Sequence, residues 1–453
     1  MVFSSTTFLF CFLPLFLIFY FISKNIKYKN IILLLFSLIF YAWGEPYYIF
    51  LMIFMLITNY VLTKVMAKNK NKGVFILLII INLLALFSFK YLNFLITNIN
   101  YLFSTNISNV KLSLPIGISF YTFQILSYVI DVYKGRVECQ KSFINLACYV
   151  SAFPQLIAGP IVRYKVIEQE LNNRNTTKED FAYGIRRFII GLSKKVLIAN
   201  NVSYVADAIF NNGITSTGFI GIIIAILTYT LQIYYDFSGY SDMAIGLGRI
   251  CGFHFDENFN YPYSATSITD FWRRWHISLS SFFRDYVYIP LGGNRTSTIK
   301  VIRNILIVWM LTGLWHGDSW NFIIWGLYYA IFLLIEKYLL KNIKINKNLY
   351  HLITLIIISI GWLIFREVEY KDLIISFKAL FGYYGIGSIN TLYYLGIFSS
   401  RYIIATILGI VFASEKIKFK DNLFNDFLLL ILFLISIIFI VVGSYNPFIY
   451  FRF

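Results

Sequence analysis

The chain has 453 residues, of which 58% are hydrophobic, 20% are aromatic and only 13% are charged, and its formal net charge is +17. Soluble domains carry about 25% charged residues, so this composition excludes a soluble enzyme and predicts an all-α, polytopic membrane protein. No stretch has the composition of a soluble domain, and we expect residues 1–453 to form a single membrane domain.

The surplus of Lys and Arg is typical of the cytoplasmic loops of membrane proteins. No compact basic module stands apart from the apolar runs, so we predict no binding of nucleic acid. The four cysteines form no C-x-x-C pair, and none lies near a histidine at the spacing of zinc ligands. We therefore predict buried free thiols and no metal site.

Apolar runs that approach 20 residues predict about ten to twelve membrane helices. The expected ranges are residues 5–22, 30–43, 46–64, 73–92, 112–130, 143–161, 218–237, 301–315, 320–339, 350–366, 391–412 and 425–443. The first run lacks a basic start and a small-residue cleavage site, so we interpret it as a retained helix rather than a signal peptide.

Basic loops alternate with nearly neutral loops in the first third of the chain. The basic loops carry Lys24, Lys27 and Lys29, then Lys68, Lys70 and Lys72, then Lys134, Arg136 and Lys141. By the positive-inside rule these loops are cytoplasmic. The pattern predicts a multi-pass protein of the cell membrane with an extracytoplasmic N-terminus.

Residues 163–200 combine many charges with an apolar face. Thr177 followed by Asp180 predicts a helix start of the capping-box type. The basic residues that follow are Arg186, Arg187, Lys194 and Lys195. They indicate an interfacial amphipathic helix, which either anchors to anionic membrane lipids or forms a platform for a phosphorylated donor.

Asp236 and Asp242 lie near the end of an apolar helix. Carboxylates at that depth are costly and usually face a cavity or a partner. We expect either neutralisation by a nearby arginine, such as Arg249, or a part in a site.

Residues 258–330 hold six of the eight tryptophans and two of the four histidines. From Ser267 or Thr269, an apolar stripe at three- and four-residue spacing predicts one amphipathic helix that Pro290 ends, with His276 at the border of the stripe. His316 follows an apolar helix and precedes Gly317, so we expect a helix break beside it.

An imidazole with its usual pKa of about 6.5 suits a general base. Acyl transfer from a thioester to a hydroxyl needs such a base, and it needs a donor for the tetrahedral oxyanion, which His276 or a tryptophan N–H would supply. A structural hydrogen bond is the alternative for either histidine. The candidate substrate-binding residues are Trp315, Asp318, Trp320 and Asp236.

Four stretches carry a family resemblance. They are FPQLIAGPIVRY (153–164), DFSGYSDMAIGLGRICGFHFDENFNYPY (236–263), DFWRRWHISLSSFFRDYVYIPLGGNR (270–295) and LTGLWHGDSWNFIIWGLYYA (311–330). They resemble the membrane-bound O-acyltransferases, and most closely the alginate O-acetyltransferase-like branch, to which the teichoic-acid D-alanyl transfer protein is related. The motif core covers residues 236–330.

The resemblance implies a ring-like bundle of about 10–12 transmembrane helices, with interfacial or re-entrant helices, around a central tunnel. It implies that His316 is catalytic and that His276 is a second functional histidine. The donor would be a cytosolic acyl thioester, commonly acetyl-CoA, with no tightly bound cofactor. The acyl group would pass through the membrane to a cell-surface polysaccharide, with the help of an extracytoplasmic SGNH-hydrolase-like partner protein.

The C-terminal tail, residues 444–453, is similar to the tail of a small partner protein in D-alanylation systems. Carried over, this similarity makes Tyr450 an acyl relay. The alternative is an aromatic anchor at the membrane interface, with Arg452 reaching toward water.

Two other functions stay open. D-alanyl transfer to teichoic acid would use a carrier-protein donor. A transporter or flippase would use His316, Asp236 and Asp242 as a path for protons or substrate, although no internal inverted repeat supports it.

Overall fold

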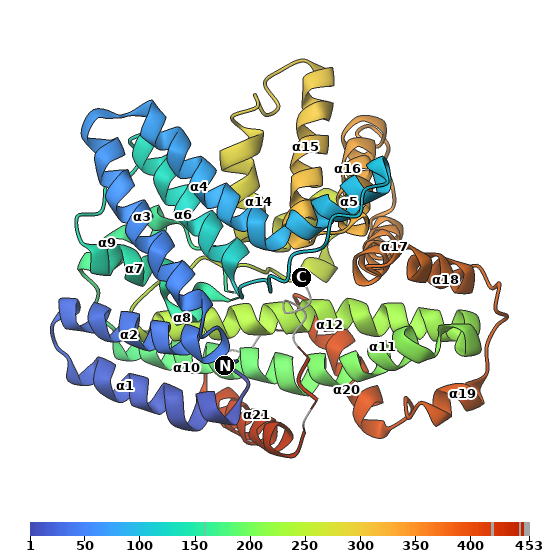
Figure 1. Cartoon of the computed structure of the whole chain (residues 1–453). Helices are drawn as coiled ribbons and strands as arrows, with labels where there is room; N and C mark the ends of the chain where they lie inside the picture. Colours follow the sequence, from blue (N-terminus) through green and yellow to red (C-terminus); the bar gives the residue numbers. More distant parts are fainter. Residues whose placement is uncertain (158, 418–420, 444, 448–453) are drawn as a thin grey trace. The chain divides into compact units, whose positions relative to one another are not determined.

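The computed structural model describes residues 1–157, 159–417, 421–443 and 445–447 (Figure 1). These residues form helices and no strand. They divide into two compact units: unit 1 comprises residues 1–188 and 241–257, and unit 2 comprises residues 189–240 and 258–453. Helix α12 (Ile214–Ile250) contributes to both units, and the single domain over residues 1–453 stays a prediction.

Eight helical stretches in the described part of the chain are long and apolar enough to cross a membrane. They are α2 (Ile26–Gly44), α3 (Tyr48–Asn69), α4 (Lys72–Lys90), α12, α15 (Thr298–His316), α16 with η5 (Trp320–Leu339), α17 (Lys347–Arg366) and α21 (Leu423–Val442). Two shorter apolar helices cover Phe8–Ile22 and Ser400–Phe412. The all-α, multi-pass class predicted from composition is confirmed.

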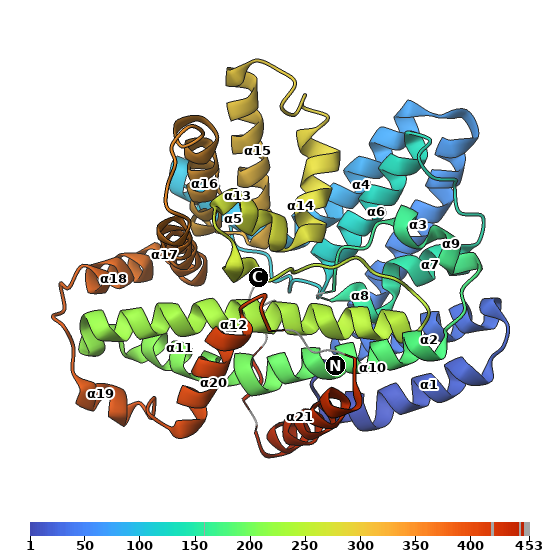
Figure 2. The same ribbon diagram turned by 180° about the vertical axis from the view of Figure 1, so that it is seen from behind.

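Unit 1 is a helical bundle in which α3, α4 and α6 (Ile118–Tyr133) pack side by side (Figure 2). Its other helices are η1 (Phe8–Phe12), α1 (Leu13–Ile22), α2, α5 (Leu92–Phe103), α7 (Phe143–Ser151), α8 (Phe153–Leu156), α9 (Tyr164–Asn172), most of α10 (Lys178–Ser193) and the end of α12. At its core, the Phe153 ring lies 5.0–5.7 Å from those of Phe12, Phe16 and Phe40. The first α8 residue thus anchors a short connection between α7 and α9.

Two expected membrane helices of unit 1 are shorter than a span. Helices α6 and α7 have 16 and 9 residues, and a crossing needs about 20. Gly117, with a left-handed φ of 77°, precedes α6, and Pro154 lies just beyond the end of α7. Because of these backbone features, both helices are shorter than the apolar runs in the sequence suggest.

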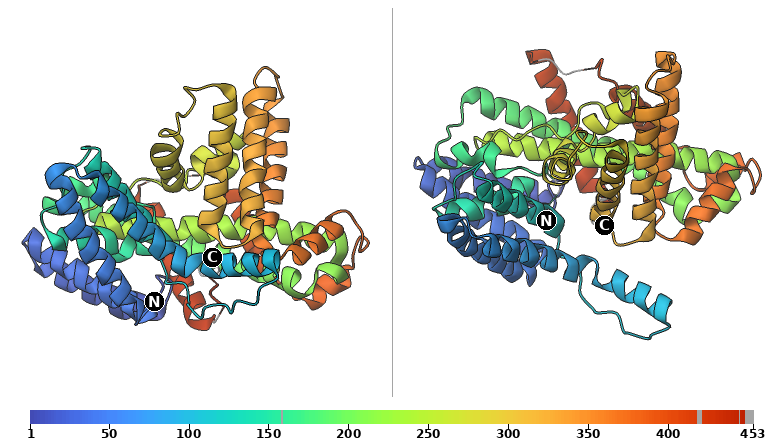
Figure 3. Two further views of the ribbon diagram at one scale, coloured as in Figure 1. Left: turned by 45° about the horizontal axis from the view of Figure 1, so that its top comes forward. Right: turned by 90° about the horizontal axis from the view of Figure 1, so that it is seen from above.

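Unit 2 contains η2 (Lys194–Ala199), α11 (Asn200–Asn212), η3 (Pro262–Ser264), α13 (Ile268–Arg274), α14 (Ile277–Phe283), η4 (Arg284–Tyr288), α15, α16, η5 (Ile335–Leu339), α17, α18 (Tyr370–Leu380), α19 (Ile389–Tyr394), α20 (Ser400–Phe412) and α21. Helices α15 and α16 stand side by side (Figure 3). A Cβ added to Gly326 would lie 2.2 Å from the Trp309 carbonyl oxygen, and one added to Gly313 would lie 2.2 Å from the Phe322 carbonyl oxygen. The close approach of the two helices therefore requires glycine at both positions.

Candidate active site

The amphipathic helix expected from Ser267 to Pro290 is broken at His276. Its start is as predicted, because the Ser267 hydroxyl accepts a hydrogen bond from the Asp270 amide at 3.0 Å. Helix α13 then ends at Arg274, and α14 begins at Ile277. His276 adopts a left-handed conformation, with φ 45° and ψ 54°. The prediction of one continuous helix is wrong.

A neighbouring segment explains the break. The Asn260 amide donates to the Arg274 carbonyl at 2.9 Å, and the Ile277 amide donates to the Asn258 carbonyl at 3.0 Å. Residues 258–260 thus satisfy backbone groups on both sides of His276 that a continuous helix would pair internally. A left-handed residue other than glycine costs roughly 1–2 kcal/mol, and such conformations cluster at functional sites.

The side chain of Asn258 holds the imidazole of His276. Its Oδ1 accepts from the Ser278 amide at 3.2 Å and from the Ser278 hydroxyl at 2.8 Å, and it lies 3.2 Å from His276 Nδ1. His276 is only 2% exposed. Burial lowers the pKa of His276 from 6.5 to about 3, so the ring is neutral near pH 7. Asn258 lies in the NFNYPY stretch, but no sequence pattern marked it as a residue of the site.

His316 is the last residue of α15 and is packed among aromatic rings. Its ring centroid lies 5.0 Å from Trp315, 5.1 Å from Trp325 and 5.1 Å from Phe365. Trp315 is also 5.7 Å from the His276 ring. The helix stops before Gly317, as predicted, and a Cβ on Gly317 would meet the Phe322 ring.

The two histidines line one cavity of about 310 Å³ in unit 2. This volume is within the range of about 300–1,000 Å³ typical of small-molecule sites. The aromatic part of its wall includes Trp272, Trp275, Phe283 and Trp309. The exposed residues Arg273 and Arg284 also line it. The arrangement combines two imidazoles, an apolar wall and cationic groups open to solvent.

A larger cavity of about 570 Å³ follows α18. Its lining is mostly apolar and aromatic, with Lys378 as the charged member, and it includes no histidine or carboxylate. It offers no general base, so the cavity of the two histidines is the better candidate for chemistry.

The four candidate substrate-binding residues do not line the histidine cavity. Trp315 is buried between the two imidazoles, whereas Asp318 is exposed and Trp320 is 57% exposed. The Asp236 carboxylate lies 2.6 Å from Lys195 Nζ, and both side chains are almost fully buried.

Asp236 and Asp242 of α12 are both neutralised, but not by Arg249, the partner expected from the sequence. Asp242 pairs with Arg187 at 2.7 Å, and Asp236 pairs with Lys195. Arg249 instead contacts Asp180 at 3.0 Å. Lys195, expected on the charged face of an interfacial helix, is buried because it neutralises Asp236.

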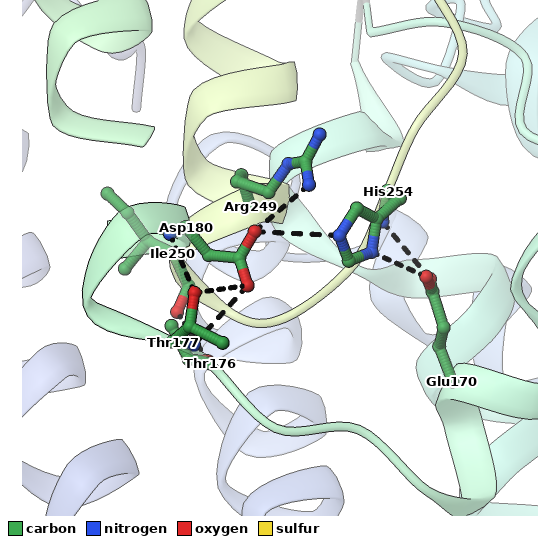
Figure 4. Close-up of polar contacts among 7 residues, drawn as sticks. All are labelled: Glu170, Thr176, Thr177, Asp180, Arg249, Ile250 and His254. Atoms are coloured by element: carbon green, nitrogen blue, oxygen red, sulfur yellow. Dashed lines mark hydrogen bonds and ion pairs between the residues drawn. The ribbon is translucent and has the colours of Figure 1, made fainter. Parts of the chain in front are cut away.

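The third histidine, His254, belongs to a polar cluster in unit 1 (Figure 4). Its Nδ1 lies 2.6 Å from Glu170, and its Nε2 lies 3.6 Å from Asp180. The Asp180 amide donates to the Thr177 hydroxyl at 3.0 Å, and the Thr177 amide donates to the Asp180 carboxylate at 3.3 Å, which confirms the predicted capping box. The cluster joins three segments: α9, the start of α10, and the loop that follows α12.

A carboxylate that the sequence analysis missed fixes the start of α13. Glu336 accepts from the amides of Ile268 and Thr269 at 2.6 and 2.8 Å, and from the Thr269 hydroxyl at 2.6 Å. Negative charge at a helix N-terminus is favourable. The fourth histidine, His351, contacts the Ala265 carbonyl at 2.7 Å.

Tyr450 lies outside the described residues. The described residues just before it are held on unit 2: the Tyr445 hydroxyl donates to Asp207, and Lys195 Nζ donates to the Pro447 carbonyl. Within the described ranges there is no group of three or more His, Cys, Asp or Glu side chains placed to hold a metal ion. All four cysteines are free thiols, but only Cys148 and Cys251 are buried; the prediction of burial is wrong for Cys11, which is exposed, and for Cys139, which is half-buried.

Comparisons with known proteins agree on one family. The model of the membrane-bound O-acyltransferase family, MBOAT, matches residues 5–364. The chain is 42% identical over 397 residues to the probable alginate O-acetylase AlgI of Pseudomonas aeruginosa, which covers 84% of this chain and 75% of that protein. It is 37% identical over 430 residues to the peptidoglycan O-acetyltransferase of Helicobacter pylori, with coverages of 86% and 81%. It is 31% identical over 268 residues to the teichoic acid D-alanyltransferase of Bacillus subtilis, with coverages of 55% and 67%.

Proposed function

Because the chain belongs to the membrane-bound O-acyltransferase family and is a multi-pass membrane acyltransferase, we propose that it moves acetyl groups from cytosolic acetyl-CoA toward hydroxyl groups of an extracellular polysaccharide. The similarity to named O-acetyl-transferring proteins over most of the chain supports acetyl as the group. The observation that carries the proposal is the cavity lined by both His276 and His316, which are 40 positions apart in the sequence.

In this proposal His316 is the general base. Its imidazole takes the proton of the acceptor hydroxyl while the hydroxyl oxygen attacks the carbonyl carbon of the thioester. The tetrahedral intermediate then collapses, the carbon–sulfur bond breaks, and the thiolate of CoA receives the proton back. The rings of Trp325 and Phe365 hold the imidazole in place.

Arg273 suits the phosphates of the donor, because it is an exposed cation on the cavity lining. Arg284 also lines the cavity, but its guanidinium is already paired with Asp285 at 2.7 Å. Guanidinium groups pair well with phosphate oxygens. The site needs no tightly bound cofactor, since the thioester itself supplies the activated acyl group.

We further propose that the protein lies in the cell membrane with an extracytoplasmic N-terminus and basic loops that face cytoplasmic lipid. Tyr450 would accept the acetyl group from the thioester as a phenyl ester and pass it outward. An SGNH-hydrolase-like protein outside the membrane would complete transfer to the polysaccharide.

The test is incubation of the purified protein with labelled acetyl-CoA, followed by measurement of CoA release and by mass spectrometry of the chain. We expect His316→Ala to lower CoA release by about 10²–10⁴-fold, the range for loss of a general base. His351→Ala is the matched control, because His351 contacts a backbone carbonyl and does not line the cavity.

The outcomes separate the parts of the proposal. Label on Tyr450 in the wild type alone supports base and relay together, whereas CoA release without label removes the relay. Full activity of His316→Ala would contradict its role as base. If acetyl-CoA is inert and a D-alanyl carrier protein is active, the acetyl donor is wrong and the function is that of the B. subtilis relative.

A further inference from the structure

The orientation of the Asn258 amide is fixed by a group that can only donate. The backbone N–H of Ser278 points at one δ atom of Asn258 from 3.2 Å. That atom must be the oxygen, because the amide NH₂ group cannot accept a hydrogen bond. Asn258 is fully buried, and its own carbonyl is tied to the Ile277 amide, so its position is set from both its main chain and its side chain.

The same oxygen determines which nitrogen of His276 carries the proton. Asn258 Oδ1 faces His276 Nδ1 at 3.2 Å and cannot donate. The Ser278 hydroxyl lies 2.8 Å from this oxygen and 3.4 Å from Nδ1, so its single proton goes to the oxygen. An unprotonated Nδ1 would leave two acceptors facing each other. Nδ1 therefore carries the proton, and in a neutral ring Nε2 is then a bare acceptor.

We infer that Asn258 is a positioning residue that holds His276 in the Nδ1–H tautomer, so that Nε2 accepts a hydrogen bond from an N–H or O–H group of the bound substrate. Nε2 is buried and has no hydrogen-bond partner among the residues that the structure describes. Buried acceptors are normally paired, and His276 lines the cavity in which the substrate would supply the donor.

The inference rests on the proposed function and changes the part that His276 plays in it. A bare Nε2 cannot donate to an oxyanion, which was one role expected for this residue. It can orient a substrate that brings its own proton. The imidazole is held for this purpose by the edge-on ring of Phe237, whose centroid is 4.7 Å away.

The tautomer can be measured without any activity. The chain has only four histidines, so ¹⁵N-histidine labelling of the full-length protein in detergent gives four pairs of ring signals, and His276→Gln identifies one pair. We expect the neutral Nδ1–H pattern for His276 at pH 7. A neutral ring with the proton on Nε2 would overturn the inference, whether or not the protein transfers acetyl groups.

Two substitutions of Asn258 then link the tautomer to transfer. Asn258→Leu removes the acceptor, and we expect acyl transfer to fall by about 10–100-fold, as when the hydrogen-bond partner of a functional histidine is lost. Asn258→Asp keeps the accepting oxygen, so it should retain the tautomer. Its charge favours the protonated imidazole, so the acid limb of the pH–rate profile should move to higher pH.

Asn82→Leu is the matched control. Asn82 is equally buried and hydrogen-bonded to Asn59 at 2.7 Å in unit 1, without a histidine partner. We expect Asn82→Leu to lower the melting temperature about as much as Asn258→Leu does. We expect it to leave the pH–rate profile of acyl transfer unchanged. If Asn258→Leu keeps the wild-type rate and pH profile, or if Asn258→Asp leaves the profile unmoved, the positioning role is refuted. Absence of acetyl transfer by the wild type would refute only the proposed function.

Discussion

Trp272 lines the same cavity as the two histidines. Its Nε1–H is buried and has no partner among the described residues. The rings of Trp309 and Tyr329 hold it at centroid distances of 4.7 and 4.8 Å. An indole nitrogen can only donate, so it complements a His276 that can only accept. We therefore predict that Trp272 stabilises the tetrahedral oxyanion.

Trp272→Phe keeps an aromatic ring but removes this donor. We expect kcat to fall by about 10²–10³-fold with little change in KM, because the lost interaction forms mainly in the transition state. Trp362→Phe is the control, since its indole donates to the Tyr263 hydroxyl at 3.1 Å and does not line the cavity. Equal kcat values for Trp272→Phe and the wild type would assign the oxyanion to another group.

The buried, neutral state of His276 makes stability depend on pH. Its pKa is about 3 in the folded protein and about 6.5 when unfolded. Between these values the unfolded chain binds more protons, so this contribution to stability is present above pH 6.5 and is lost as the pH falls toward 3. The loss is at most about 1.4 kcal/mol per pH unit.

His276→Gln removes the titrating group. The wild type therefore loses stability relative to the variant as the pH falls. We expect the unfolding free energy of the wild type minus that of the variant to decrease between pH 7 and pH 5. Denaturant unfolding in detergent at several pH values measures it. A difference that is constant with pH would show that His276 titrates normally in the folded protein.

At the scale of helices, the packing of α15 against α16 positions His316. Gly326→Ala would place a methyl group against the Trp309 carbonyl, and overpacking of this kind costs about 1–3 kcal/mol. We expect a lower melting temperature and reduced activity, because α15 must shift and carries His316 at its end. Gly44→Ala is the control, because the nearest atom to its new Cβ is 3.7 Å away; an equal effect of both would argue against the packing role.

The helices also show which parts of the site the sequence could predict. The end of α15 at His316 follows from a local signal, the glycine after it. The break at His276 depends on hydrogen bonds to residues 258–260, which no local pattern reveals, and the apolar stripe continues across it. The burial of Lys195 likewise depends on Asp236, a residue 41 positions away. Amphipathic spacing alone therefore predicted, wrongly, that Lys195 is exposed.

For the molecule as a whole, composition was enough to predict a polytopic helical protein, but not how many runs are long enough to cross. The apolar residues of α6 are buried against protein, and hydropathy cannot distinguish such a helix from one that faces lipid. The loops between α2, α3 and α4 fall where the alternation of basic and neutral segments placed them.

The proposed orientation can be tested by cysteine labelling in cells. In a variant that lacks the four native cysteines, Lys70→Cys should react only when reagent reaches the cytoplasm, and Thr105→Cys should react from outside. Both positions are exposed, Lys70 between α3 and α4 and Thr105 after α5. The reverse pattern would place the N-terminus in the cytoplasm.

The left-handed backbone at His276 has a consequence for engineering this protein. Glycine and asparagine adopt that conformation more easily, so a redesign guided by thermostability alone would favour replacing the histidine. If His276 has the proposed role, stability and function conflict at this position, which is the expected trade-off where function depends on a strained residue. Stabilised versions should therefore be sought by changes elsewhere in the chain, with position 276 and its neighbour in space, Asn258, held constant.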